Sequence, residues 1–310
     1  MTRPVLATRT AFARATLDKV ERLLEVLAAL REDPILGDAF VLYGGTALNV
    51  FLDHLPRLSV DIDLMYAGSP DLDGMRGQRP IIDARLREVV GKLGYTAKSM
   101  NDEHSGQTYR LRYGDDYLKI DVSYLARVPL LEPQEIACAA AEPRVAFPVL
   151  DLRELIAGKV KALMEREAAR DLYDLARLGR RDPKRLDDPL ARALVVRAVS
   201  SADTFPAISG PAEALDKFAY PSDDVIEPLR AMLAADDEPD VAEMRGHVAR
   251  LLAPLSQSTA NESEYLRLLG QEARDRPELL FESWPDVLER ARRDPVMQWK
   301  VVSLKKRPHG

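Results

Sequence analysis

The pattern of apolar and polar positions divides the chain into a mixed first part and a helical second part. Residues 16–31 carry apolar side chains at helical spacing, and residues 40–43 form a short apolar run that predicts a buried strand. From residue 152 onward, helical spacing recurs with only short breaks. We therefore predict an α/β (α+β) domain over residues 1–150 and a helical C-terminal domain over residues 151–310.

Further elements of the first part follow from alternation and turn signals. Residues 58–66, 107–113 and 117–124 alternate like strands, and the Gly-Asp-Asp at 114–116 predicts a hairpin between the last two. Residues 46–52 and 81–93 predict helices. The glycines and prolines between 67 and 79 predict a loop. In the second part we predict helices over residues 152–164, 169–178, 189–200, 213–218, 226–233, 241–252, 263–272 and 286–292, with a break where the apolar phase slips around 166–169.

Composition narrows the class of protein. The 310 residues are 46% hydrophobic and 30% charged, which is typical of a globular chain with a sizeable core. A net charge of −6 gives no global basic footprint for nucleic acid, although a local basic strip could serve. The single cysteine, Cys138, excludes a disulfide framework and a cysteine zinc site within one chain.

No segment of the sequence indicates a membrane or secretory role. Residues 1–17 carry three arginines and lack the apolar stretch of a secretory signal. No apolar run approaches the length of a transmembrane helix. We therefore expect a cytoplasmic protein without a membrane partner.

The candidate chemistry lies in two neighbouring segments, GGTALN at residues 44–49 and RLSVDIDL at residues 57–64. Asp61 and Asp63 are two residues apart, so on a strand they point to the same face. Two carboxylates on one face repel each other, but they are the ligands that a metal-dependent transfer site uses. Alone, a diglycine and an Asp-x-Asp are also compatible with a β-turn and two surface aspartates.

The diglycine fits the same chemistry. Gly44 and Gly45 would let backbone N–H groups approach a triphosphate closely. A helix that begins at Thr46 would direct the positive end of its dipole at the same anion. Ser59 shares the face of Asp61 and could bond a phosphate, while Arg57 could either hold the strand end or contact a phosphate.

Taken together, the pattern GGTALN…RLSVDIDL resembles the AbiEii/AbiGii toxin family of bacterial nucleotidyltransferases. The resemblance implies a nucleotidyltransferase-type mixed sheet in which Asp61 and Asp63 hold Mg²⁺ or Mn²⁺ and residues 44–46 cradle an NTP. Asp121 has the same strand parity as Lys119 and Ser123. If its strand neighbours that of Asp61, Asp121 becomes a third carboxylate of the site.

A second motif, residues 154–178, is similar to a downstream helical motif of that family. By this resemblance Lys159 would neutralise phosphate charge, and Asp171 and Asp174 would match the aspartates of the motif. Asp171 could also pair with Lys159, because an unpaired buried charge is costly. From spacing alone, the same residues also fit an ordinary charged helix face.

The resemblance implies a MenT-like toxin of a toxin–antitoxin pair, with a separately encoded antitoxin. Its reaction would transfer NMP from an NTP to an acceptor hydroxyl such as a tRNA 3′ end. An acceptor of the aminoglycoside type, a protein acceptor and a non-catalytic nucleotide-binding regulator stay open. An RNA backbone would be expected on a basic strip, either residues Arg177, Arg180, Arg181, Lys184 and Arg185 or residues Lys300, Lys305, Lys306 and Arg307.

Overall fold

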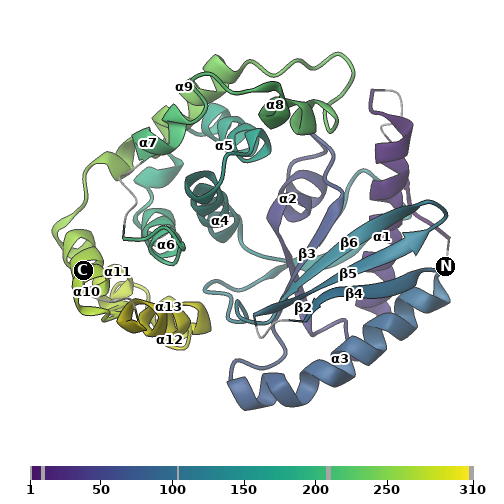
Figure 1. Cartoon of the computed structure of the whole chain (residues 1–310), viewed down its shortest axis with the longest axis horizontal. Coiled ribbons are helices and arrows are strands. Elements are labelled where there is room, and N and C mark those ends of the chain that lie inside the picture. Colours follow the sequence, from purple (N-terminus) through teal and green to yellow (C-terminus); the bar gives the residue numbers. More distant parts are fainter. Residues whose placement is uncertain (1, 8–10, 103–104, 207–210, 307–310) are drawn as a thin grey trace. The chain divides into compact units, whose positions relative to one another are not determined.

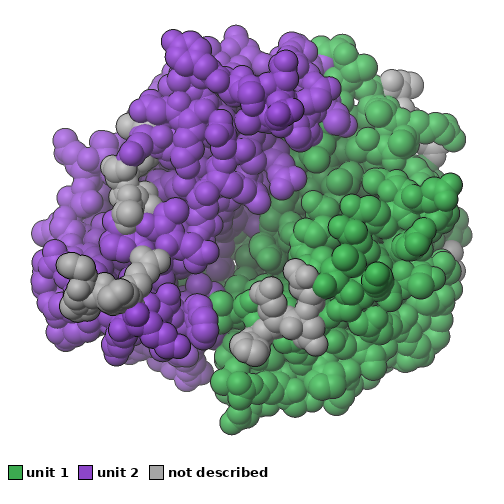
Figure 2. Space-filling model, in the orientation of Figure 1, with its two compact units in different colours: residues 1–151, 232–236 green, residues 152–231, 237–310 purple. Residues whose placement is uncertain are grey.

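The computed structural model describes residues 2–7, 11–102, 105–206 and 211–306. These residues divide into two compact units (Figures 1 and 2). Unit 1 comprises residues 1–151 together with the segment 232–236, and unit 2 comprises residues 152–231 and 237–310. That residues 1–150 and 151–310 fold as separate domains stays a prediction.

Unit 1 is built on a sheet of seven strands in the order β4-β5-β6-β3-β2-β9-β7. Strand β3 pairs in parallel with β6, and β2 in parallel with β9, while the other neighbours are antiparallel. The sheet is therefore mixed, as the fold class predicts. Its strands are β2 (Phe40–Tyr43), β3 (Asp61–Tyr66), β4 (Thr96–Asp102), β5 (Gly106–Tyr113), β6 (Asp116–Ser123), β7 (Gln134–Ala137) and β9 (Ala146–Val149), and a separate two-stranded sheet joins β1 (Val5–Leu6) to β8 (Ala141–Glu142).

Helices α1 (Arg14–Glu32) and α3 (Leu72–Lys92) cover one face of this sheet (Figure 1). Alternate residues of β5 and β6, such as Tyr109, Leu118 and Ile120, are fully buried on that face. Asp83 of α3 accepts a hydrogen bond from the hydroxyl of Tyr109, which fixes the direction of the buried set. The residues between them, which are polar, therefore point to the opposite face.

The loop predicted at residues 67–79 is wrong over most of its length, because helix α3 begins at Leu72. Asp71 caps the helix, its carboxylate accepting a hydrogen bond from the backbone N–H of Gly74 at 2.7 Å. Pro80 lies inside the helix. Burial of residues such as Met75 and Ile82 therefore outweighs the low helix propensity of the glycines and the proline.

The segment 232–236 belongs to unit 1 although unit 2 flanks it in sequence. The backbone N–H of Leu58 donates to the carbonyl of Met232 at 2.8 Å, and the N–H of Ala235 donates to the carbonyl of Ala11 at 2.7 Å. The segment is thus hydrogen-bonded to the residues that immediately precede β3 in the sequence, and β3 is the strand that carries the predicted site.

The regular elements of unit 2, within its described residues, are helices joined by turns and short connections. The predicted break around 166–169 is confirmed, because α4 ends at Glu165 and α5 begins at Ala169. The carboxyl-terminal helix α13 was not predicted. The helices are α4 (Leu152–Glu165), α5 (Ala169–Arg181), α6 (Pro189–Ser200), α7 (Pro211–Asp216), α8 (Asp223–Arg230), α9 (Val241–Leu252), α10 (Ala260–Glu272), α11 (Glu278–Phe281), α12 (Pro285–Arg292) and α13 (Pro295–Lys306). None of the helices within the described ranges is long and apolar enough to cross a membrane.

Candidate active site

Asp61 and Asp63 open strand β3 on its polar face. Ile62 between them is fully buried on the opposite face, whereas both aspartates are partly exposed. The antiparallel register pairs Asp63 with Tyr43 of β2, and the parallel register pairs it with Asp121 of β6. Three strands therefore contribute one row of side chains, Tyr43, Asp63 and Asp121, with Asp61 one step away on the same face.

Strand β6, which carries Asp121, pairs directly with β3. This meets the condition under which Asp121 was predicted to lie beside Asp61 and Asp63. The Thr108 hydroxyl on β5 donates to one oxygen of Asp121 at 2.6 Å. The Lys119 ammonium forms an ion pair with the other oxygen. One oxygen of Asp121 is thus held from the neighbouring strand β5 and the other from Lys119 on its own strand, β6.

Lys119 lies beside these carboxylates, although the sequence reasoning did not select it. Its register partner on β3 is Asp61. Burial would lower the pKa of the Lys119 ammonium, but Asp121, and then Asp61 and Asp63, raise it above the ordinary value. The group therefore remains a cation at neutral pH and reduces the mutual repulsion of the three carboxylates. The sequence feature that could have pointed to Lys119 is its position two residues before Asp121 on the same strand, which places both side chains on one face.

Tyr43 lies on the other side of Asp63. Burial raises the pKa of its hydroxyl above the ordinary range, and the charges of Asp63 and Asp121 raise it further. The side chain is consequently a neutral hydrogen-bond donor at any physiological pH.

The diglycine lies against these side chains and leaves no room for a larger residue. Gly44 has a φ of +72°, and a Cβ atom placed on it would lie 2.2 Å from Oδ2 of Asp63. A Cβ atom on Gly45 would lie 2.8 Å from Oγ of Ser59. Packing against the site carboxylate and Ser59 therefore requires glycine at both positions, apart from any approach to a triphosphate.

Thr46 and Arg57 hold the motif in place from inside the fold. The Thr46 hydroxyl is fully buried and donates to the backbone carbonyl of Asp61 at 2.5 Å, so it ties α2 (Gly44–Thr46) to β3. Arg57 is 1% exposed, and its guanidinium donates to the carbonyl of Leu58 at 3.0 Å. Of the two roles considered for Arg57, these contacts favour holding the strand end.

In unit 2, Lys159 lies between two buried carboxylates. Its ammonium is 3.0 Å from Oδ1 of Asp171 and 2.6 Å from Oδ2 of Asp174. The Arg166 guanidinium donates to both oxygens of Asp171, at 2.7 and 3.1 Å. These ion pairs fix the end of α4 to the start of α5 across the break at residues 166–168.

The charge of Asp171 depends on these partners. Burial would raise the pKa of the Asp171 carboxyl, but Lys159 and Arg166 outweigh it and lower that pKa below its ordinary value. Asp171 is therefore ionised at neutral pH. A phosphate that binds Lys159 would have to compete with two carboxylates already in contact with it.

The donors of unit 1 fit a magnesium or manganese ion. Among the residues that the structure describes, no group of three or more His, Cys, Asp or Glu side chains is arranged as a complete metal site. Mg²⁺, however, commonly takes one or two protein carboxylates and completes its shell with water and substrate phosphates. Asp61 and Asp63 supply that number of oxygen ligands on one face, and oxygen donors suit Mg²⁺ and Mn²⁺.

The predicted basic strip at the carboxyl end is wrong for one of its members. Lys300 is 5% exposed, and its ammonium donates to the backbone carbonyls of Ala202 and Phe205. It therefore stabilises the packing of α13 and offers no charge to a ligand. Arg307 lies outside the described residues.

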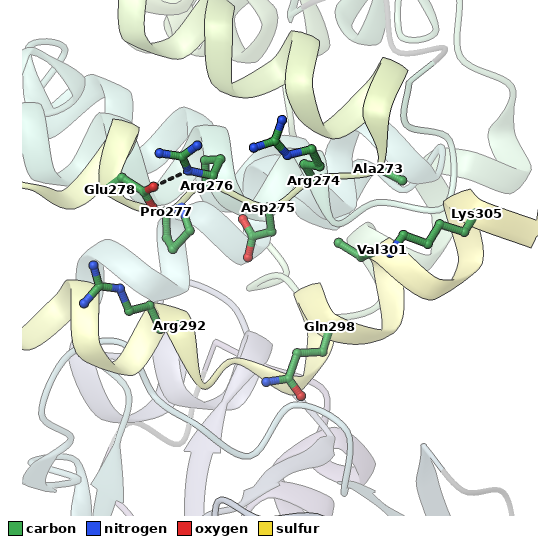
Figure 3. A pocket seen from close by; sticks show the side chains of 10 residues that line it. All are labelled: Ala273, Arg274, Asp275, Arg276, Pro277, Glu278, Arg292, Gln298, Val301 and Lys305. Carbon is green, nitrogen blue, oxygen red and sulfur yellow. Dashed lines mark hydrogen bonds and ion pairs between the residues drawn. The ribbon is translucent and has the colours of Figure 1, made fainter.

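Unit 2 contains a pocket of about 630 Å³ that is lined by residues 273–278, which connect α10 to α11, and by residues of α12 and α13 (Figure 3). Arg276 and Glu278, which form an ion pair, lie at one end, and Lys305 lies at the other. None of the residues predicted for catalysis or nucleotide binding lines it.

Comparison with known proteins identifies a family. Residues 25–278 match the family described as the nucleotidyl transferase AbiEii toxin of type IV toxin–antitoxin systems. No curated protein matches the sequence. Among solved structures, the chain is similar to MenT4, a nucleotidyltransferase toxin from Mycobacterium tuberculosis H37Rv, with a TM-score of 0.56, 19% identity, and coverage of 94% of this chain and 95% of that one.

A second solved structure, the CdnC:HORMA-deltaN complex from E. coli MS115-1, matches with 16% identity over 91% of this chain and 93% of that one. Its TM-score of 0.27 is too low to indicate a shared fold. The similarity to MenT4 shows the fold, and the family match spans both candidate motifs. The chain belongs to the AbiEii family of nucleotidyltransferase toxins.

Proposed function

We propose that this nucleotidyltransferase transfers NMP from an NTP to the 3′ hydroxyl of a tRNA. The observation that carries the proposal is the row of carboxylates across β3 and β6, with Asp61 and Asp63 on one face and Asp121 register-paired with Asp63. The diglycine that packs against Asp63 supports it. A chain that only bound a nucleotide would not need these charges together.

In the proposed reaction, the acceptor oxygen forms a bond to the α-phosphorus. The bond from that phosphorus to the bridging oxygen of the β-phosphate breaks, and pyrophosphate leaves. Asp61 and Asp63 would hold Mg²⁺, which when bound supplies positive charge to the triphosphate. Asp121, oriented by Thr108, accepts the proton of the attacking hydroxyl. Lys119 places a cation where phosphate charge gathers.

Lys159 has a different role in this proposal. Its ammonium is already paired with Asp171 and Asp174, and only a small part of the side chain is exposed. We therefore assign these residues to holding the α4–α5 junction, and phosphate contact by Lys159 remains the role that the family resemblance suggests.

Membership of the family also suggests what the protein does in the cell. As a toxin of a type IV system, the chain would have a separately encoded antitoxin and would act in the cytoplasm, where NTPs and tRNA are found. Co-expression of that antitoxin should restore the growth that the toxin arrests.

The test compares the wild-type chain with Asp61→Asn and with Asp115→Asn, a matched change at an exposed turn residue. Each is induced in a bacterial host, and RNA 3′ ends are sequenced. We expect growth arrest and extended tRNA ends for wild type and Asp115→Asn, and neither for Asp61→Asn. Removing one charge-stabilising group typically costs about 10²–10³ in rate.

A purified assay separates the alternatives. Labelled NTP is offered with total RNA, with cell protein and with aminoglycosides, with and without a chelator. Label on protein or antibiotic alone would replace the tRNA acceptor, and the absence of any transfer by a folded enzyme would favour a nucleotide-binding regulator. Transfer that survives the chelator would exclude the proposed metal.

A further inference from the structure

The polar face of the sheet continues outward from the carboxylates as a row of cations. Lys119 of β6 is the register partner of Asp61, Arg110 of β5 is the partner of Lys119, and Lys98 of β4 is the partner of Arg110. Directly paired residues point to the same face of a sheet. The row therefore runs from the site aspartates to the edge strand β4.

A second row lies beside it. Arg112 of β5 pairs with Tyr117 of β6, and the Arg110 guanidinium lies 4.8 Å from the centre of the Tyr117 ring. Tyr117 is 41% exposed, and Lys98, Arg110 and Arg112 are all exposed. Within the described parts of the chain, none of these three cations forms an ion pair with a carboxylate. We call Lys98, Arg110, Arg112 and Tyr117 the basic strand face.

Uncompensated cations on neighbouring strands repel one another, and here they gather in a chain whose net charge is −6. Phosphates would relieve this repulsion, and an exposed tyrosine beside an arginine offers a surface on which a base can stack. Grooves for single-stranded nucleic acid combine these two features. The chemistry of the basic strand face therefore favours a nucleic acid over a protein partner.

The dimensions agree with a short single strand. Three strand spacings separate β3 from β4, which is about 14 Å at ordinary sheet geometry. With roughly 3.4 Å per phosphate along a stacked strand, that distance accommodates about four nucleotides. A strand that crosses the sheet along this row ends at Asp61 and Asp63.

We propose that the basic strand face binds the single-stranded end of the acceptor nucleic acid and delivers its terminal hydroxyl to the site aspartates. The inference rests on the proposed function for the identity of the acceptor. It goes further in assigning the binding surface to β4, β5 and β6 of unit 1, where neither of the basic strips expected from the sequence lies.

The test measures binding of a short fluorescent single-stranded RNA to the full chain by anisotropy, without NTP or Mg²⁺, at several salt concentrations between about 50 and 200 mM. Lys98→Glu/Arg112→Glu reverses two charges of the face. Arg76→Glu/Lys92→Glu makes the same change in net charge on α3, which covers the other face of the sheet. Tyr117→Ala removes only the ring.

Three distinct results are expected. The Lys98/Arg112 variant should bind at least about tenfold more weakly, with a salt slope shallower by about 1.4, since each phosphate contact on a single strand contributes about 0.7. Tyr117→Ala should weaken binding about tenfold with an unchanged slope, because stacking releases no counterions. The α3 variant should bind like wild type. Thermal unfolding of all three checks that the fold persists.

Other outcomes overturn the inference. Equal losses in the Lys98/Arg112 and α3 variants would show a general charge effect. An acidic peptide that binds as tightly as RNA, with the same dependence on Lys98 and Arg112, would assign the face to a protein partner. If the Lys98/Arg112 variant still extends tRNA at the wild-type rate, the face is not the acceptor site and the proposed function stands. If wild type transfers NMP to no RNA but binds it through this face, the proposed function fails instead.

Discussion

Replacing Gly44 with alanine tests whether the diglycine exists to accommodate Asp63. The new Cβ atom would lie 2.2 Å from Oδ2 and 2.9 Å from Cγ of Asp63, so the carboxylate must retreat by about 1 Å to reach ordinary contact. The φ of +72° adds a backbone cost. A non-glycine residue in the left-handed region costs about 1–2 kcal/mol, and a side chain forced off its rotamer costs about 0.5–1.5 kcal/mol.

Gly94 provides the matched control. Its φ is +85°, and a Cβ atom there would have no neighbour within 4 Å. Gly94→Ala therefore imposes the backbone cost without the contact. We expect Gly94→Ala to lose about 1–2 kcal/mol of unfolding free energy and to keep its activity, and Gly44→Ala to lose about 2–3 kcal/mol. Displacing a reacting group by about 1 Å typically costs about 10²-fold, so Gly44→Ala should lose transfer activity by that factor.

The assay combines urea unfolding with the initial rate of labelled NMP transfer at saturating NTP. If Gly44→Ala transfers NMP at the wild-type rate, the Asp63 carboxylate tolerates the displacement and the diglycine is not needed to accommodate it. If Gly94→Ala loses as much activity as Gly44→Ala, backbone strain alone explains the effect.

Three further predictions concern the groups that hold the motifs. Lys159→Met should lower the unfolding free energy by about 3–5 kcal/mol, measured in urea, because it removes the cation that lies between two buried carboxylates; a loss below about 1 kcal/mol would contradict a structural role. The folded-state pKa of Asp171 is lowered below its unfolded value of about 3.9, so the unfolded chain binds this proton more readily. The contribution of Asp171 is therefore complete above about pH 5 and is lost as the pH falls through the folded pKa, and acid titration of stability should show a smaller loss in Asp171→Asn than in wild type. Thr46→Val should cost about 1–2 kcal/mol in thermal unfolding, because the carbonyl of Asp61 loses its buried donor, whereas unchanged stability would show that the bond contributes nothing.

Much of the fold could be predicted from sequence because it is locally encoded. Helix α1 and strand β2 follow from apolar spacing, and the hairpin of β5 and β6 follows from its turn. Helix α3 could not be predicted in full, because its glycines and Pro80 signal a loop and only tertiary burial outweighs them. Strand β4, at the edge of the sheet, was not predicted, because it is defined by its pairing with β5 and not by a local pattern.

The candidate site shows the same division. That Asp61 and Asp63 share a face follows from strand parity, which can be read from the sequence. Which residues lie beside them depends on the register between strands, which cannot be read from the sequence. The parallel pairing of β3 with β6 is what places Asp121 and Lys119 beside them. Similarly, the alternation of residues 107–113 predicts that Arg110 and Arg112 share a face, yet only the register places Arg110 in line with Asp61 and Arg112 beside Tyr117.

The segment 232–236 has a consequence for the synthesis of the protein. The backbone N–H of Leu58, three residues before strand β3, donates to the carbonyl of Met232, and the carbonyl of Ala11 accepts from the N–H of Ala235. A chain emerging from the ribosome presents its amino-terminal part first, and domains generally fold as they emerge. Unit 1 lacks these two hydrogen bonds until residue 236 has been synthesised. A nascent or prematurely terminated chain would therefore lack the hydrogen bonds that hold the residues next to strand β3.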